Sequence, residues 1–153
     1  GFSDADWGGD KEDRKSTSGY LFIYSGAPIT WRSIKQTCVT LSSTEAEYVA
    51  LSKASQEILW LRRLANDLGA VKSEEPTFLF EDNMSTIGLL NNQSNIHNRS
   101  KHIDLRFHFV RDLVRDKTIK VEHCPSKEML ADLLTKPLTK EQFTRLREWM
   151  SMK

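Results

Sequence analysis

Residues 42–69 carry a long helical pattern, and this segment constrains the fold more than any other. Its apolar residues recur at spacings of three, four and seven, as on one face of an α-helix; they are Leu51, Ala54, Ile58, Leu61, Ala65 and Leu68. Two overlapping capping boxes, Ser42 with Glu45 and Thr44 with Glu47, predict where the helix begins, and a glycine after the last turn predicts its end. A helix with one long apolar stripe needs a second layer to cover that stripe.

Short segments of strand character lie on both sides of this helix. Residues 19–25 and 29–35 are separated by turn residues and predict a hairpin. Residues 77–80 form an apolar run typical of a buried strand, and residues 118–123 predict a further strand. Residues 2–3 resemble the end of a first strand, most of which we expect to be truncated in this sequence.

Further helical patterns cover residues 83–90, a basic segment ending near residue 115, residues 126–136 and a final helix after Thr139. Expected inward-facing residues are Ile103, Phe107, Val110 and Val114 in the basic helix, and Phe143, Leu146 and Trp149 in the final one. The later strands need crossovers to run parallel to the first. The sequence therefore predicts an α/β fold, a five-stranded mixed sheet flanked by helices, in a single domain of residues 1–153.

The composition excludes several classes of protein. A hydrophobic fraction of 39% with only 7 glycines and 4 prolines argues against a disordered or collagen-like chain. No apolar run approaches the roughly 18 residues of a membrane span, so we expect an intracellular protein with no membrane partner. Cys38 and Cys124 are too few for a disulfide framework and lack the spacing of a zinc site, and we expect both to be buried.

The net charge is only +1, but the charge is unevenly distributed. Residues 1–13 hold five acidic residues against one lysine, a net charge of −4, and residues 97–120 hold seven basic residues against three acidic ones, a net charge of +4. This distribution fits a cation site beside a phosphate-binding surface, although ordinary solvated faces would give the same pattern.

Four carboxylates stand near points where predicted strands and helices begin or end: Asp4, Glu47, Asp82 and Asp132. Each has an ordinary explanation, respectively as a turn residue, half of a capping box, a helix N-cap and an i,i+4 partner of Lys136. Glu47, however, continues the apolar stripe of the long helix and should point at the sheet. Asp4 and Asp82 follow strand ends, where ligands collect in open sheets.

Convergence of these carboxylates would require cations. Two carboxylates about 4 Å apart repel by ~4 kcal/mol at an effective dielectric constant of about 20. Ligand sets made only of oxygen favour Mg²⁺ or Mn²⁺ over Zn²⁺, and paired ions about 4 Å apart are typical of enzymes that carry out displacement at phosphorus.

The chain contains, in this order, SDADW, DRKSTSGY, ITWRSIKQ, LSSTEAEYVAL, EDN, NRSKHIDLRFHFVRD and LADLLTKPL. This set resembles the ribonuclease H domain at the C-terminal end of copia-type retrotransposon polyproteins, over essentially the whole chain. The resemblance implies the ribonuclease H-like fold and a metal-dependent endoribonuclease that cuts the RNA strand of RNA·DNA hybrids during reverse transcription. It also implies two Mg²⁺ ions that Mn²⁺ can replace, the reverse transcriptase domain of the same polyprotein as a partner, and a cytoplasmic location within retroelement particles.

The acidic quartet of that family falls on Asp4, Glu47, Asp82 and Asp132, the four carboxylates identified above. By this resemblance Asp4 would bridge both metal ions. Glu47 and Asp82 would complete one metal site, and Asp132 would complete the other.

Three neighbouring residues are weaker candidates. Asp6 lies beyond the matching acid, and Glu45 points about 200° away from Glu47 around the helix. His123 is the only candidate for the histidine that helps the product leave in many cellular relatives, and a strand-end histidine is more often a packing residue.

Expected phosphate contacts come from Arg14, Lys15, Ser16 and Thr17 after the first strand, and from Arg99 and Lys101 before the basic helix. A hybrid that is recognised through its backbone and 2′-hydroxyls needs no base-reading motif, and the sequence has none. A solvated helix face remains the alternative for each basic residue.

Two other functions are compatible with this fold. A catalytically inactive relative would bind nucleic acid or a neighbouring polyprotein domain as a scaffold, and an integrase-type transferase shares the fold and metals but places its acids differently. The presence of all four acids favours the ribonuclease.

Overall fold

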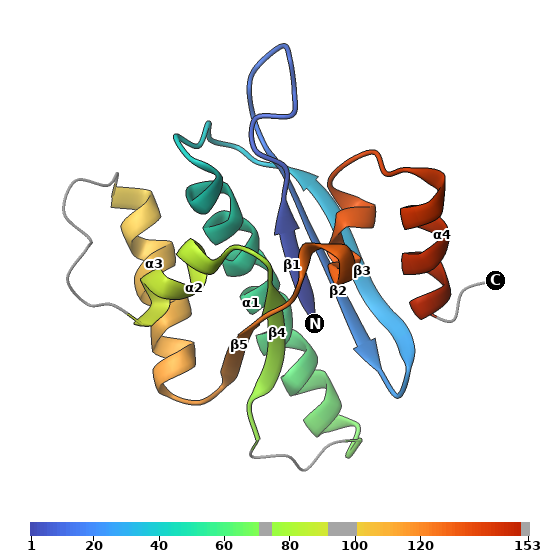
Figure 1. Ribbon diagram of the computed structural model, residues 1–153. Coiled ribbons are helices and arrows are strands. Elements are labelled where there is room, and N and C mark those ends of the chain that lie inside the picture. Colours follow the sequence, from blue (N-terminus) through green and yellow to red (C-terminus); the bar gives the residue numbers. More distant parts are fainter. Residues whose placement is uncertain (71–74, 92–100, 151–153) are drawn as a thin grey trace.

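The computed structural model describes residues 1–70, 75–91 and 101–150. Five strands form one sheet in the order β3-β2-β1-β4-β5 (Figure 1). Their bounds are β1 Phe2–Ala5, β2 Thr17–Tyr24, β3 Ala27–Lys35, β4 Thr77–Glu81 and β5 Ile119–His123. β2 is antiparallel to both β1 and β3, whereas β4 is parallel to both β1 and β5. The predicted five-stranded mixed sheet is confirmed.

Helices cover both faces of the sheet (Figure 1). One face carries α1 Ser43–Asp67, α2 Met84–Asn91 and α3 Lys101–Arg115. The opposite face carries the 3₁₀ helix η2 Leu130–Leu134 and α4 Lys140–Trp149, with the short η1 Ser126–Glu128 preceding η2. Among the described residues, no helix has both the length and the apolarity that crossing a membrane requires.

The core on the α1 face joins α1 to α3 and to the central strands. Leu51 and Ile58 of α1 are fully buried together with Leu79 of β4. The ring of Tyr48 stacks on that of Phe107, with ring centroids 3.8 Å apart and the ring planes 9° apart. The predicted stripe of α1 is therefore confirmed over its first half and fixes the rotation of the helix about its axis.

The N-terminus of α1 uses one of the two predicted capping boxes. The Ser42 hydroxyl accepts a hydrogen bond from the Glu45 backbone N–H at 3.2 Å, and the Glu45 carboxylate accepts one from the Leu41 N–H at 2.7 Å. Because Ser42 and Glu45 form this box, Glu47 is not needed for capping. Its side chain is buried, 6% exposed, against the sheet.

The segment 126–136 differs from the prediction of one α-helix. It forms two 3₁₀ helices separated by Met129, whose backbone is extended at ψ 100°, and the N-cap of the first is Pro125 and not the predicted Ser126. Met129 is fully buried with Cys124 and Ala131. Packing of this segment onto the sheet thus outweighs its local helical preference.

Several predicted core residues are exposed instead. Leu68 is 71% exposed beyond the end of α1, and Phe143 and Trp149 are about half-exposed on α4, where only Leu146 of the predicted stripe is buried. Cys124 is buried as predicted, but Cys38 is only partly buried. Phe143 lines an apolar pocket with Leu21 and Trp31 of the sheet, so it faces the sheet without being closely covered by it.

Gly19 in β2 determines how closely η2 approaches the sheet. A Cβ atom at this position would lie 2.7 Å from Thr135 Cγ2, 2.9 Å from Leu134 Cβ and 3.1 Å from the Ala131 carbonyl oxygen. Gly19 pairs with Asp4 in the register of β1 and β2. The missing side chain therefore brings the η2 segment, which carries Asp132, against the strand that carries Asp4.

Candidate metal centre

Three carboxylates from separate elements converge at one edge of the sheet. Asp4 lies in β1, Glu47 in α1 and Asp82 directly after β4, and each offers an oxygen within 4.8 Å of the others. Asp4 and Glu47 are buried, at 1% and 6% exposure, and Asp82 is partly buried. The parallel pairing of β1 with β4 explains the convergence, because neighbouring parallel strands end at the same edge.

The ordinary explanations for these three carboxylates do not hold. The cap of α2 is Asn83, whose side-chain oxygen accepts from the backbone N–H groups of Ser85 at 2.9 Å and Thr86 at 3.1 Å, so Asp82 is not the N-cap. Asp4 is a buried strand residue and not a turn residue. Their side chains are thus not committed to those local roles.

Asp132 lies beside this group and has its own partners. Its Oδ1 forms an ion pair with Lys136 Nζ at 2.8 Å. Its Oδ2 accepts a hydrogen bond from Gln142 Nε2 at 3.4 Å. Asp132 therefore does form the i,i+4 ion pair with Lys136 that its spacing predicts.

The same segment also contacts Asp4. Lys136 Nζ lies 3.6 Å from Asp4 Oδ1, and the Thr135 hydroxyl donates a hydrogen bond to Asp4 Oδ2. Lys136 thus stands between the carboxylates of Asp4 and Asp132. Burial lowers the pKa of Lys136, but attraction to these two carboxylates outweighs it and leaves the pKa above its ordinary value.

Burial and mutual repulsion raise the pKa values of the clustered carboxyl groups. Burial is the main cause for Asp4, opposed by the attraction of Lys136. Burial, with repulsion from Glu81 and Asp4, raises the pKa of Glu47 well above its ordinary value. Burial raises the pKa of Asp132 to about 6 despite the contact with Lys136. A multivalent cation would lower all three values by the opposite electrostatic effect.

The chemistry of this group fits a hard divalent cation. Glu47 Oε2 is buried and has no hydrogen-bond partner in the described part of the chain, and the group consists only of carboxylates. Buried carboxylate oxygens without donors are costly unless they ligate a cation. Oxygen-only ligands suit Mg²⁺ or Mn²⁺.

Glu81 is a buried carboxyl group that the sequence reasoning missed. It is fully buried in β4 and accepts hydrogen bonds from Ser3 Oγ and from the Asn83 N–H, each at 3.2 Å. Burial raises its pKa well above the ordinary value. Strand alternation could have found it, because Leu79, two residues earlier, is a core residue on the same face.

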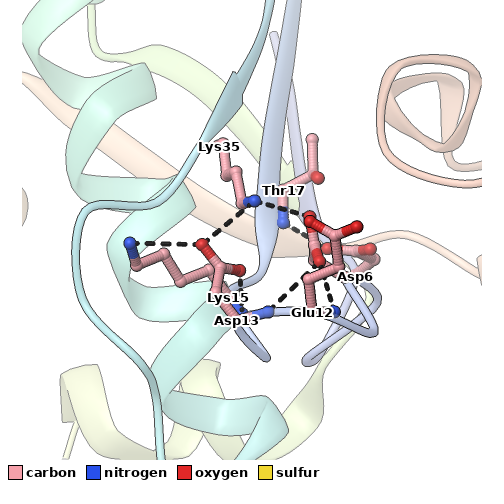
Figure 2. Close-up of polar contacts among 7 residues, drawn as sticks. Asp6, Glu12, Asp13, Lys15, Thr17 and Lys35 are labelled. Carbon is pink, nitrogen blue, oxygen red and sulfur yellow. Dashed lines mark hydrogen bonds and ion pairs between the residues drawn. The ribbon is translucent and has the colours of Figure 1, made fainter.

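The two acids ranked lower have other roles. Asp6 accepts a hydrogen bond from the backbone N–H of Thr17, and Glu45 belongs to the cap of α1. Lys35, the last residue of β3, forms an ion pair with Asp13 of the loop before β2 at 3.0 Å (Figure 2). It also pairs with Asp10 of the same loop at 2.5 Å. Of the acidic N-terminal segment, therefore, only Asp4 belongs to the carboxylate cluster.

The predicted phosphate contacts are placed unevenly. Arg14 is exposed at φ 58, Thr17 is partly buried, and Lys15 pairs with Asp13 at 3.3 Å. The Ser16 hydroxyl is fully buried, 3.0 Å from the Gly8 backbone nitrogen and 3.2 Å from Thr40 Oγ1. It therefore cannot make the substrate contact that the sequence predicted. Arg99 and the side chain of Lys101 lie outside the described residues, and His123 is exposed at the end of β5.

Solved structures with a similar fold are ribonucleases H. Ribonuclease H1 from Halobacterium salinarum aligns with a TM-score of 0.56 and 16% identity, covering 88% of this chain and 91% of that chain. LC11-RNase H1, isolated from compost, aligns with a TM-score of 0.60 and 16% identity, covering 88% and 89%. A further structure of LC11-RNase H1, in complex with an RNA/DNA hybrid, has a TM-score of 0.56.

Similar sequences are segments of retrovirus-related Pol polyproteins. The chain is 42% identical over 152 residues to that of transposon TNT 1-94 from Nicotiana tabacum, covering 99% of this chain and 11% of the relative. It is 41% identical over 142 residues to that of transposon RE1 from Arabidopsis thaliana, covering 93% and 10%. The chain thus spans about a tenth of the length of these relatives. No protein-family model matches it.

Together, the sheet order and these structural likenesses define a domain with the ribonuclease H fold. The chain is a homologue of one segment of the Pol polyproteins of copia-type retrotransposons, and the resemblance seen in its motifs is confirmed.

Proposed function

We propose that this chain is a metal-dependent endoribonuclease that hydrolyses the RNA strand of RNA·DNA hybrids during reverse transcription of a retroelement. The single observation that carries the proposal is the convergence of Asp4, Glu47 and Asp82 within 4.8 Å at the end of two parallel strands. The similarity to ribonucleases H and to Pol polyproteins supports the same assignment.

The proposal assigns the metal ligands. Asp4, Glu47 and Asp82 would hold one divalent cation, and Asp4 and Asp132 would hold the second. Two such ions, Mg²⁺ or in its place Mn²⁺, would supply an activated water nucleophile and stabilise the leaving 3′ oxygen. The chain itself contributes fixed positions, since Thr135 and Gln142 each donate a hydrogen bond to one of these carboxylates.

The proposal also assigns the substrate surface and the setting. Arg14, Thr17 and Lys15 lie in or next to the loop after β1 and would contact phosphates or 2′-hydroxyls of the hybrid, with Arg99 and Lys101 as further candidates. The reverse transcriptase domain of the same polyprotein would be the neighbouring partner, within cytoplasmic retroelement particles. Residues 1–153 would act as one domain of that polyprotein.

A cleavage assay tests the proposal directly. The chain is incubated with a hybrid labelled on the RNA strand, with Mg²⁺ or Mn²⁺ and with or without EDTA. We expect RNA fragments when Mg²⁺ or Mn²⁺ is present without EDTA, and none when EDTA chelates the metal. Retained hybrid binding without any product, in either metal, would instead favour the inactive scaffold.

Asp82→Asn sharpens the test. We expect it to abolish metal-dependent cleavage while leaving the circular dichroism spectrum unchanged, because Asp82 is partly exposed and does not cap α2. Asp6→Asn is the matched control, since an amide oxygen can still accept the Thr17 N–H, and it should cleave normally. Normal cleavage by Asp82→Asn would exclude this ligand assignment.

A further inference from the structure

The two proposed cation positions differ in the groups that already occupy them. The position between Asp4, Glu47 and Asp82 has a buried Glu47 oxygen with no hydrogen-bond partner among the described residues. The position between Asp4 and Asp132 has the Lys136 ammonium, 3.6 Å from one carboxylate and 2.8 Å from the other. The first position therefore has a carboxylate oxygen without a donor, whereas the second already has a cationic group between its two carboxylates.

Lys136 is held at the second position by the fold. It follows η2 four residues after Asp132, and the Thr135 hydrogen bond to Asp4 fixes the backbone next to it. Its side chain is 37% exposed, whereas those of Asp4 and Asp132 are 1% and 3% exposed. The ammonium thus reaches two buried carboxylates from the solvent side and can swing outward on its flexible stem.

We propose that Lys136 is a built-in counter-ion of the second cation position, and that the second divalent ion binds only by displacing it. This inference rests on the proposed function, because it uses the same ligands. The ammonium forms ion pairs with Asp4 and Asp132, whereas no ion pair joins it to Glu47 or Asp82 in the described part of the chain. It therefore opposes a divalent ion most strongly at the Asp4–Asp132 pair, and the two positions fill in order. The position formed by Asp4, Glu47 and Asp82 fills first.

The opposing effects of Lys136 can be separated by removing its charge. Without the ammonium, two buried carboxylates face each other uncompensated, so the metal-free protein should be less stable. The same change removes the competitor, so a divalent ion should bind at the second position more tightly. A lysine that merely covered the surface would produce neither effect.

The test is a titration of the substrate-free chain with Mn²⁺. Binding is monitored by calorimetry and by the electron paramagnetic resonance signal of free Mn²⁺. In the unchanged chain we expect one tight and one weaker site. In Lys136→Met we expect the dissociation constant of the weaker site to fall about tenfold, with little change at the tight site. Lys140→Met is the matched control, because Lys140 is exposed on α4 and its replacement changes the net charge equally.

A second measurement on the unchanged chain covers the case in which Lys136→Met does not fold without metal. The Nζ resonance of Lys136, identified by its absence in Lys136→Arg, is followed during a Mg²⁺ titration. It should shift mainly with the second equivalent, because the first ion acts on it only through the shared ligand Asp4. A shift that is complete with the first equivalent, or no shift through both, would overturn the role of Lys136.

The outcomes distinguish a failure of the role proposed for Lys136 from a failure of the proposed metal-dependent function. If neither the unchanged chain nor Lys136→Met binds Mn²⁺, the metal centre itself is wrong, and the counter-ion role with it. The counter-ion role is wrong, and the metal centre stands, if the unchanged chain and Lys136→Met have the same dissociation constant at the weaker site. The same conclusion follows if Lys140→Met tightens that site as much as Lys136→Met does.

Discussion

The hydroxyl of Thr135 donates a hydrogen bond to the buried carboxylate of Asp4, from a residue 131 positions further along the chain. The contact joins the end of η2 to β1, the strand that the close approach at Gly19 brings within reach. The C-terminal segment therefore supplies Asp132 and also orients Asp4.

Thr135→Val should destabilise the metal-free protein by roughly 1–3 kcal/mol, because the buried Asp4 oxygen loses its donor while the side-chain volume is kept. Chemical denaturation in EDTA measures the change. Thr135→Ser retains the hydroxyl and should recover most of the stability. Equal stability of Thr135→Val and the unchanged chain would mean that this hydrogen bond contributes nothing.

The metal-free protein should lose stability as the pH rises. A carboxyl group whose pKa is raised by folding binds its proton more tightly in the folded state, so its contribution is present below the unfolded pKa and is lost above it. For Asp132 the loss runs from the ordinary 3.8 to about 6, and the larger rise at Glu47 and Glu81 extends it upward. Melting curves in EDTA should show Tm falling over this range, and excess Mg²⁺ should reduce the fall. A Tm that rises with pH in EDTA would contradict the burial of these groups.

Glu47→Gln and Glu81→Gln form a matched pair that separates a ligand from a buried neighbour. Each removes an ionisable group whose pKa burial raises well above its ordinary value, so each should stabilise the metal-free protein at neutral pH. Only Glu47 belongs to the group within 4.8 Å of Asp4 and Asp82. Glu47→Gln should therefore lose tight Mn²⁺ binding and hybrid cleavage, whereas Glu81→Gln should retain both. Loss of Mn²⁺ binding in Glu81→Gln would make that residue a ligand.

Gly19→Ala should push η2 away from the sheet, because its Cβ would lie 3.1 Å from the Ala131 carbonyl and closer still to two side chains. Overpacking of this kind costs roughly 1–3 kcal/mol. The displacement should also weaken cleavage, since Asp132 moves with η2. Gly88→Ala is the control, because nothing lies within 4 Å of its added Cβ, and it should not destabilise the fold. Full activity and stability in Gly19→Ala would show that η2 accommodates the methyl group.

The sequence predicted most of the fold because strands and helices are encoded by periodicity among neighbouring residues. The α1 stripe through Leu51 and Ile58, the hairpin and the strands around it are all found in the structure. Local patterns failed where packing decided the outcome. Residues 126–136 break at the buried Met129, and Phe143 and Trp149 remain half-exposed although both continue the apolar pattern of α4.

For the candidate site, the sequence by itself determined which carboxylates stand near the ends of strands and helices, and its motifs indicated the family. Tertiary structure alone decided what each carboxylate faces. The free oxygen of Glu47, the ammonium of Lys136 between Asp4 and Asp132, and the buried Glu81 all depend on how distant segments pack. The physical reason is that electrostatic interaction depends on distance and burial in space, and neither quantity can be obtained from spacing along the chain.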